Sequence, residues 1–135
     1  MDINISIDVE DAVREALSPF FTIYCRPLPK NYTTPNLLVS VVGGSDLNTI
    51  DTFEVTLDSR AELEGDALEY LRKAIGTLKA LANEGTTPIR YVKVNSSGSW
   101  GNDPVRPDLA MCSARLQVKA HLEPTSITTK GKKSK

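Results

Sequence analysis

The stretch from Ser59 to Gly85 carries an apolar stripe at helical spacing, and this stripe constrains the fold more than any other feature. The spacing predicts one long amphipathic helix with a single apolar face. Ser59 and Glu62 have the spacing of a capping box, which predicts that the helix begins at Ser59, and Gly85 is expected to end it. Such a face needs a sheet or a second helix to cover. The stripe consists of Ala67, Leu71, Ala74, Ile75, Leu78, Leu81 and Ala82.

A second, shorter helix is predicted near the N-terminus. Val9 and Val13 begin an apolar face at helical spacing, and Asp8 stands where a side chain can cap the first turn. Pro19 disfavours continuation, so we expect a helix over residues 9–18. Residues 1–8 form a lead-in in which apolar and polar residues partly alternate, as in a strand.

Five further segments have the character of strands, because they are rich in β-forming residues or alternate between apolar and polar positions. Gly43 and Gly44 are expected to form the turn that ends the second of them. Three polar loops are predicted over Lys30–Pro35, Ser45–Thr49 and Asn95–Pro107. The predicted strands cover residues 22–26, 36–42, 53–57, 89–94 and 111–122.

The order of helix, strands, long helix and strands predicts an α+β two-layer sandwich. We expect a mainly antiparallel sheet of four or five strands, with mixed pairing left open, and both helices packed on one face. The length of 135 residues suits one domain, which we place at residues 1–124. Residues 125–135 are expected to form a basic, flexible tail, since they contain one large apolar residue.

The net charge of −1 excludes a uniformly basic nucleic-acid-binding protein. It is a cancellation, because the tail carries four lysines and the rest of the chain has an acidic excess. No apolar run approaches the ~20 residues of a membrane helix, and the acidic start lacks the pattern of a signal peptide. We therefore expect a soluble cytosolic protein without membrane contact.

No catalytic or cofactor-binding motif is present in the sequence. Two cysteines, Cys25 and Cys112, and one histidine, His121, are too few for a four-ligand zinc site. We expect the cysteines to be reduced and buried or half-buried, although a Cys–His nucleophile pair is a formal alternative. The loop acids Asp46, Asp51, Asp103 and Asp108 are expected to be solvated, the alternative being a site for a hard cation. The sequence thus predicts no enzyme, no cofactor and no metal.

The order of these segments and three short motifs resemble the tail terminator proteins of long-tailed bacteriophages. The motifs are Arg26-Pro27-Leu28-Pro29 after a strand, Gly43-Gly44 after an apolar strand, and Asp103-Pro104 with Arg106-Pro107-Asp108 before the last long strand. The resemblance extends over about Val9 to Leu122. The basic C-terminal residues have no counterpart in it.

The resemblance implies a structural virion protein of the tail or neck, assembled in the host cytoplasm. Such proteins form a ring, commonly a hexamer, that caps the tail tube, stops its polymerisation and joins it to the head connector or stopper protein. A ring subunit needs two complementary lateral faces. Interface candidates from the predicted loops are Tyr32, Asp46, Trp100, Arg106 and Asp108, of types common in interfaces.

Three alternatives remain open at this point. Tyr32 and Trp100 could instead pack on their own subunit. The chain could be another phage neck or minor tail protein. It could also be a small nucleic-acid-binding domain, since the lysines of the tail with Arg115 and Lys119 could contact phosphates. In a virion, the basic tail is expected to contact either an acidic neighbouring subunit or passing DNA.

Overall fold

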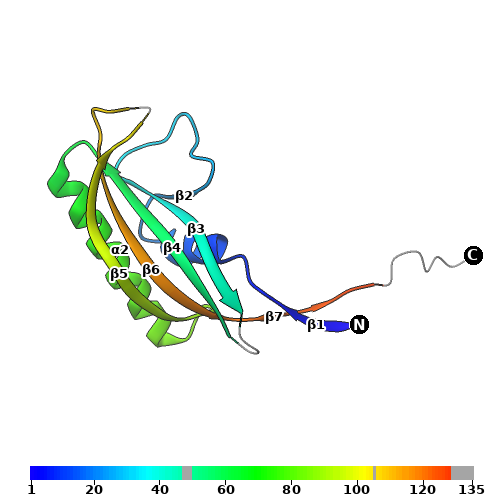
Figure 1. The fold of residues 1–135 in the computed structure, drawn as a ribbon. Helices are drawn as coiled ribbons and strands as arrows, with labels where there is room; N and C mark the ends of the chain where they lie inside the picture. Colours follow the sequence, from blue (N-terminus) through cyan, green and yellow to red (C-terminus); the bar gives the residue numbers. More distant parts are fainter. Residues whose placement is uncertain (47–49, 105, 129–135) are drawn as a thin grey trace, which may run out of the picture.

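The computed structural model describes residues 1–46, 50–104 and 106–128, with the side chains of residues 45, 46 and 102 left aside. Within them the chain forms two helices, a five-stranded mixed sheet and a two-stranded sheet (Figure 1). This α+β fold confirms the predicted class. In order, the elements are β1 (Asp2–Ile5), α1 (Val9–Leu17), β2 (Ile23–Cys25), β3 (Asn36–Asp46), β4 (Ile50–Ala61), α2 (Glu64–Glu84), β5 (Ile89–Asn102), β6 (Ala110–His121) and β7 (Glu123–Ser126).

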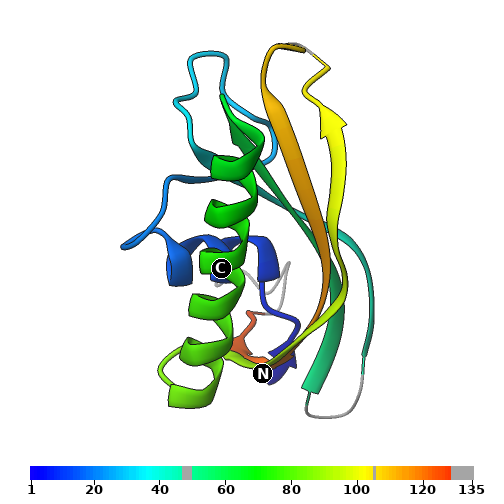
Figure 2. The ribbon, with the colours of Figure 1, turned by 90° about the vertical axis from the view of Figure 1, so that its left-hand side faces the viewer.

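The large sheet has the strand order β2-β3-β4-β6-β5. Strands β2 and β3 are parallel, and the other neighbours are antiparallel. Both helices lie on one side of this sheet (Figure 2), so their apolar faces and the inward side chains of the strands form one core. The described part contains no helix long and apolar enough to cross a membrane. Fully buried leucines of the core are Leu17, Leu37, Leu57, Leu71, Leu78 and Leu116.

The other face of the sheet is polar, and no described helix covers it (Figure 2). The register aligns Ser40, Thr56, Arg115 and Ser96 in one row across four strands. Arg115 reaches Glu54 across the β4–β6 pair at 3.3 Å. This alternation between a buried and a solvated face is the pattern from which the strands were predicted.

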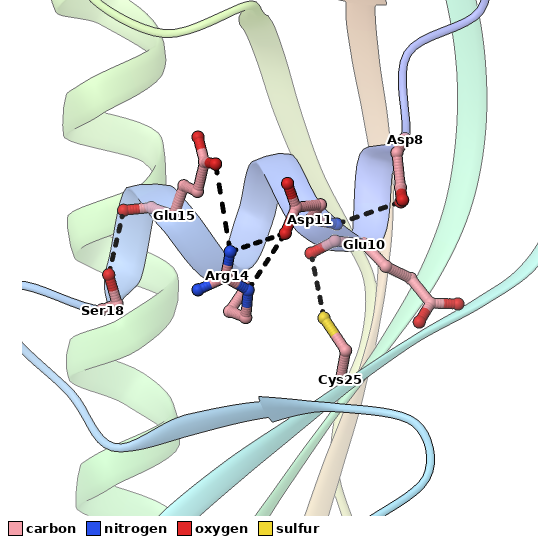
Figure 3. Close-up of polar contacts among 7 residues, drawn as sticks. All are labelled: Asp8, Glu10, Asp11, Arg14, Glu15, Ser18 and Cys25. Carbon is pink, nitrogen blue, oxygen red and sulfur yellow. Dashed lines mark hydrogen bonds and ion pairs between the residues drawn. The ribbon is translucent and has the colours of Figure 1, made fainter.

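Helix α1 begins as the sequence predicts. The Asp8 carboxylate accepts a hydrogen bond from the backbone N–H of Asp11 at 3.1 Å, and Arg14 pairs with Asp11 at 2.6 Å (Figure 3). Glu10 points the other way and ties the helix to the sheet. Its Oε2 accepts hydrogen bonds from Arg26 at 2.8 Å and from the backbone N–H of Val41 at 3.2 Å. Burial alone would raise the pKa of Glu10, but these two donors outweigh it and hold the pKa below its ordinary value.

A depressed pKa makes the contribution of Glu10 dependent on pH. The ionised form is stabilised in the folded state, so its contribution is present above the ordinary pKa of 4.5 and is lost as the pH falls through the lower folded value. We expect Glu10→Gln to lower the free energy of unfolding by about 1 kcal/mol at neutral pH, the scale of a charge-assisted hydrogen bond. Denaturant unfolding at neutral and acidic pH measures this. The difference should shrink in acid, and a difference that stays constant would contradict the assignment.

The start of α2 differs from the prediction. The helix begins at Glu64 after Leu63, which provides no side-chain cap. Ser59 belongs to β4 instead, where it pairs with Cys112 and is fully buried. The capping box is therefore wrong, because pairing with β6 extends β4 through Ala61. The predicted end is confirmed, since Gly85 adopts a left-handed conformation with φ of 74°.

The two interpretations of Ser59 predict opposite effects of Ser59→Ala. Loss of an N-cap costs about 1 kcal/mol. In the structure the buried Ser59 hydroxyl has no hydrogen-bond partner in the described part of the chain. We therefore expect Ser59→Ala to leave the free energy of unfolding unchanged or to raise it, because an unpaired buried hydroxyl is removed. Chemical denaturation of the variant measures the sign, and a loss near the N-cap value would contradict the strand assignment.

Gly43 and Gly44 lie inside β3 and do not end it. Gly43 pairs with Glu54 and Gly44 with Phe53, after a register shift that follows Val41. A Cβ on Gly44 would lie 2.9 Å from the carbonyl oxygen of Thr52. The predicted turn is therefore wrong, and glycine at position 44 serves a close approach of two strands.

Strand β5 also extends further than predicted. Residues 95–102, which the sequence places in a polar loop, pair with β6 as far as Asn102 and Ala110. Register shifts interrupt this pairing, one of them between Ser97 and Ser99, where Gly98 has a φ of 82°. Because of the bulges and the serine-rich composition, apolar and polar residues do not alternate regularly here, so periodicity does not predict the strand.

The ends of the chain form a separate ribbon. Strands β1 and β7 pair antiparallel, with Asp2 opposite Ser126, and the ribbon projects from the body (Figure 1). The strand character of the lead-in is confirmed. Strand β7 extends two residues past the expected boundary at residue 124, through Thr125 and Ser126. Residues 129–135 of the expected tail lie outside the described residues.

Candidate functional site

A buried ion pair lies where the β5–β6 connection meets the end of β4. Arg60 Nε donates to Asp103 Oδ2 at 2.6 Å, and the two side chains are only 7% and 2% exposed. Arg60 is near the end of β4, and Asp103 directly follows β5. Because charges are costly to bury, further hydrogen bonds to such a pair matter for its stability. In the described residues the Arg60 Nη1 has no hydrogen-bond partner, so the additional bonds are made to Asp103.

Two further groups hold the Asp103 carboxylate. The Tyr32 hydroxyl donates to Oδ2 at 3.1 Å, and the backbone N–H of Arg106 donates to Oδ1 at 3.1 Å. Burial, and then the hydrogen bond to Asp103, raise the pKa of Tyr32, so the phenol remains a donor at neutral pH. Asp103 thus fixes three segments of the chain: the 30–35 loop, the end of β4 and the β5–β6 connection.

Two exposed charged side chains lie next to the groups that Asp103 holds. The guanidinium of Arg106 stands 5.9 Å from the centre of the Tyr32 ring and pairs with Asp108 at 3.4 Å. The Arg106 and Asp108 side chains are 47% and 70% exposed. Below them Leu109 is buried, and its N–H bonds to the Arg106 carbonyl at 3.0 Å. The connection therefore presents Arg106 and Asp108 to solvent from a fixed backbone, and we call these two residues with Tyr32, Arg60 and Asp103 the charged corner.

The structure brings three of the five predicted interface residues together in the charged corner, namely Tyr32, Arg106 and Asp108. Tyr32 packs on its own subunit, as one alternative held. Trp100 lies on β5, in a strand rather than the predicted loop, and is 47% exposed. The backbone of Asp46 pairs with Asp51 at the far end of β3, and its side chain lies outside the described residues.

Sequence reasoning missed the two residues that organise the charged corner. Asp103 was expected to be a solvated loop acid, and Arg60 fell within the supposed capping box. The expectation is also wrong for Asp51, which is 2% exposed. A pair separated by 43 residues leaves no local signal.

The cysteines and the histidine considered for catalysis do not form a common site. Cys25 and Cys112 are free thiols, half-buried and buried as predicted. Burial raises the pKa of both thiols, which favours the protonated form. Cys112 and His121 stand near opposite ends of β6, about 30 Å apart at ~3.3 Å per residue. Within the described residues, no three His, Cys, Asp or Glu side chains are grouped to hold a metal ion.

Comparison with models of known protein families gives no match, and comparison with curated proteins gives none either. The site is therefore interpreted from its own geometry. It is a charged, solvent-facing corner at one end of the sheet, with an exposed tryptophan on the adjacent edge strand. Arg and Trp on a fixed backbone are typical of protein–protein contacts.

Proposed function

We propose that the chain is a structural assembly protein of the tail terminator type. In this role it forms a homo-oligomeric ring that caps the tail tube and meets the head connector or stopper protein. The observation that carries the proposal is the charged corner, in which a buried ion pair fixes an exposed Arg106–Asp108 pair. Asp103 also accepts a hydrogen bond from the Arg106 backbone N–H, so the backbone that carries this pair loses little conformational entropy on binding, which favours an interface.

The overall fold supports the same proposal. The resemblance was drawn from an order of elements, and the α+β sandwich keeps that order over most of its length. A ring needs two different lateral faces. The charged corner at one end of the sheet and the projecting β1–β7 ribbon at the other supply two such surfaces of different chemistry.

Size-exclusion chromatography with light scattering tests the proposal, with the chain alone and with tail-tube subunit. We expect a species of three or more copies of the 14.7 kDa chain that binds the tube. The charge reversal Arg106→Glu should weaken assembly or tube binding about tenfold, as loss of one interface charge pair does. Glu84→Lys, on the exposed end of α2, is the matched control. A chain that stays monomeric and binds neither the tail tube nor the connector would reject the proposal. Binding to a different component of the neck would favour the alternative that this chain is another neck protein.

A nucleic-acid-binding domain is the second candidate, and one observation favours it. Lys93 and Lys119 lie on the open face of the sheet, and the Lys119 ammonium stands 5.3 Å from the centre of the Tyr91 ring. The neighbouring Arg115 is already paired with Glu54. If this face binds DNA, fluorescence anisotropy will show binding that weakens steeply with salt and with Lys93→Glu.

A further inference from the structure

The β1–β7 ribbon has few contacts with the rest of the molecule. Its two strands pair with each other, and neither packs extensively on another element. An isolated two-stranded ribbon is marginally stable in water and usually needs a further surface. Its root is fixed, since the Ser6 hydroxyl donates to the buried Asp51 carboxylate. The ribbon is therefore anchored at its base and lacks a partner surface in the described part of its own chain.

The tip of the ribbon carries two exposed apolar side chains and leads into a basic segment. Met1 and Ile127 are 80% and 46% exposed. Met1 and Ile127 exchange two backbone hydrogen bonds, at 2.9 and 3.1 Å, so these apolar side chains lie together. The sequence that follows, residues 128–135, contains four lysines and no acidic residue.

A groove of opposite character lies beside the start of α2. It has a volume of about 390 Å³ and is lined by Pro35, Ala61 and Tyr70 among apolar groups, and by the carboxylates of Glu62, Asp66 and Glu69 with one ammonium, Lys73. Leu63, next to it in sequence, is 65% exposed. We call this the acidic groove.

The ribbon cannot fill the acidic groove of its own chain. Its root is at Asp51, at the start of β4, and the groove begins at Ala61, the end of the same strand. At ~3.3 Å per residue these points are about 33 Å apart. The ribbon projects away from the body (Figure 1). A second copy of the chain is thus the occupant that geometry and charge both suit.

We propose that the β1–β7 ribbon and the lysines after it dock in the acidic groove of the next copy. This inference rests on the proposed ring, for which it names the lateral contact. Donor and acceptor are different surfaces at opposite ends of β4, so the contact is heterologous and repeats around a ring. Apolar contact from Ile127 to Leu63 and the attraction of lysines to carboxylates act together.

Carbodiimide cross-linking of a mixture of ¹⁴N- and ¹⁵N-labelled wild-type protein tests the contact directly. We expect mixed-isotope cross-links that join lysines of residues 130–135 to Glu62, Asp66 or Glu69. Glu84, on the same helix but outside the groove, is the internal control and should give none. Cross-links of these lysines to other acids only, or only within one chain, would overturn the inference.

A charge-swap cycle provides the second readout. Glu62→Lys with Glu69→Lys, and separately Lys132→Glu with Lys133→Glu, should each raise the concentration for half-assembly about tenfold or more. The combined variant should recover assembly, because the charges are complementary again. Thermal unfolding checks that each variant folds. If each pair of substitutions reduces assembly on its own and the combined four-residue variant does not recover it, direct docking is contradicted.

The same samples separate this inference from the proposed function. If light scattering shows a ring-sized assembly but no cross-link reaches the acidic groove, the proposed ring stands and the docking contact is rejected. If cross-links reach the acidic groove but light scattering shows a species of only two copies, the docking contact is supported and the ring is rejected.

Discussion

Asp103→Asn is expected to lower the free energy of unfolding by about 3–5 kcal/mol, the cost of leaving a buried charge without its partner. The substitution removes the negative charge that faces Arg60 at 2.6 Å, where both side chains are almost fully buried. It also disturbs the hydrogen bonds that Tyr32 and the Arg106 N–H make to the same carboxylate. Denaturant unfolding followed by circular dichroism measures the loss.

Asp108→Asn is the matched control for this prediction. Asp108 also pairs with an arginine, but its side chain is 70% exposed. An exposed pair contributes about 0–1 kcal/mol, so the control should unfold close to wild type. The double variant Arg60→Leu with Asp103→Leu should be more stable than Asp103→Asn, because no unpaired charge remains. Equal effects of Asp103→Asn and Asp108→Asn would show that the charged corner is not organised around a buried pair.

Leu78→Ala is expected to be the other strongly destabilising change, with a loss of about 3 kcal/mol from a core leucine truncated to alanine. Leu78 is fully buried on the apolar face of α2, where that helix covers the sheet. Leu63→Ala is the control, since Leu63 flanks the same helix but is 65% exposed. It should leave the free energy of unfolding nearly unchanged. Thermal and denaturant unfolding compare the two, and similar losses would contradict the packing of α2 on the sheet.

Much of the fold could be predicted because it is written in local periodicity. The stripe from Ala67 to Ala82 becomes the buried face of α2, and the Asp8 cap starts α1 as expected. The alternation of residues 111–122 becomes β6, an interior strand of the sheet between β4 and β5. In each case the period of the apolar residues matches the period of the element.

The errors share a physical cause, which is pairing between residues distant in sequence. Gly44 reads as a turn but lies in β3 because it allows close approach to Thr52. The serines of β5 have a loop composition but pair with β6 across bulges. Ser59 has the spacing of an N-cap residue, but it lies in β4 and pairs with β6. Tertiary context overrides local preference at these positions.

The candidate site was predictable in part. Tyr32, Arg106 and Asp108 were chosen by residue type, and they meet in one place because Asp103 joins their segments. Asp103 and Arg60 were missed, since burial of a charged pair depends on contacts that spacing does not encode. The ribbon was missed for the same reason, because β1 and β7 come from opposite ends of the chain.

Electron microscopy of the purified full-length protein, imaged alone and with tail-tube subunit, tests the central claim most directly. The proposed function predicts closed rings of uniform diameter, with one ring capping the end of each tube and tube growth halted there. Single 14.7 kDa particles under both conditions, with tubes that lengthen freely in their presence, would contradict it.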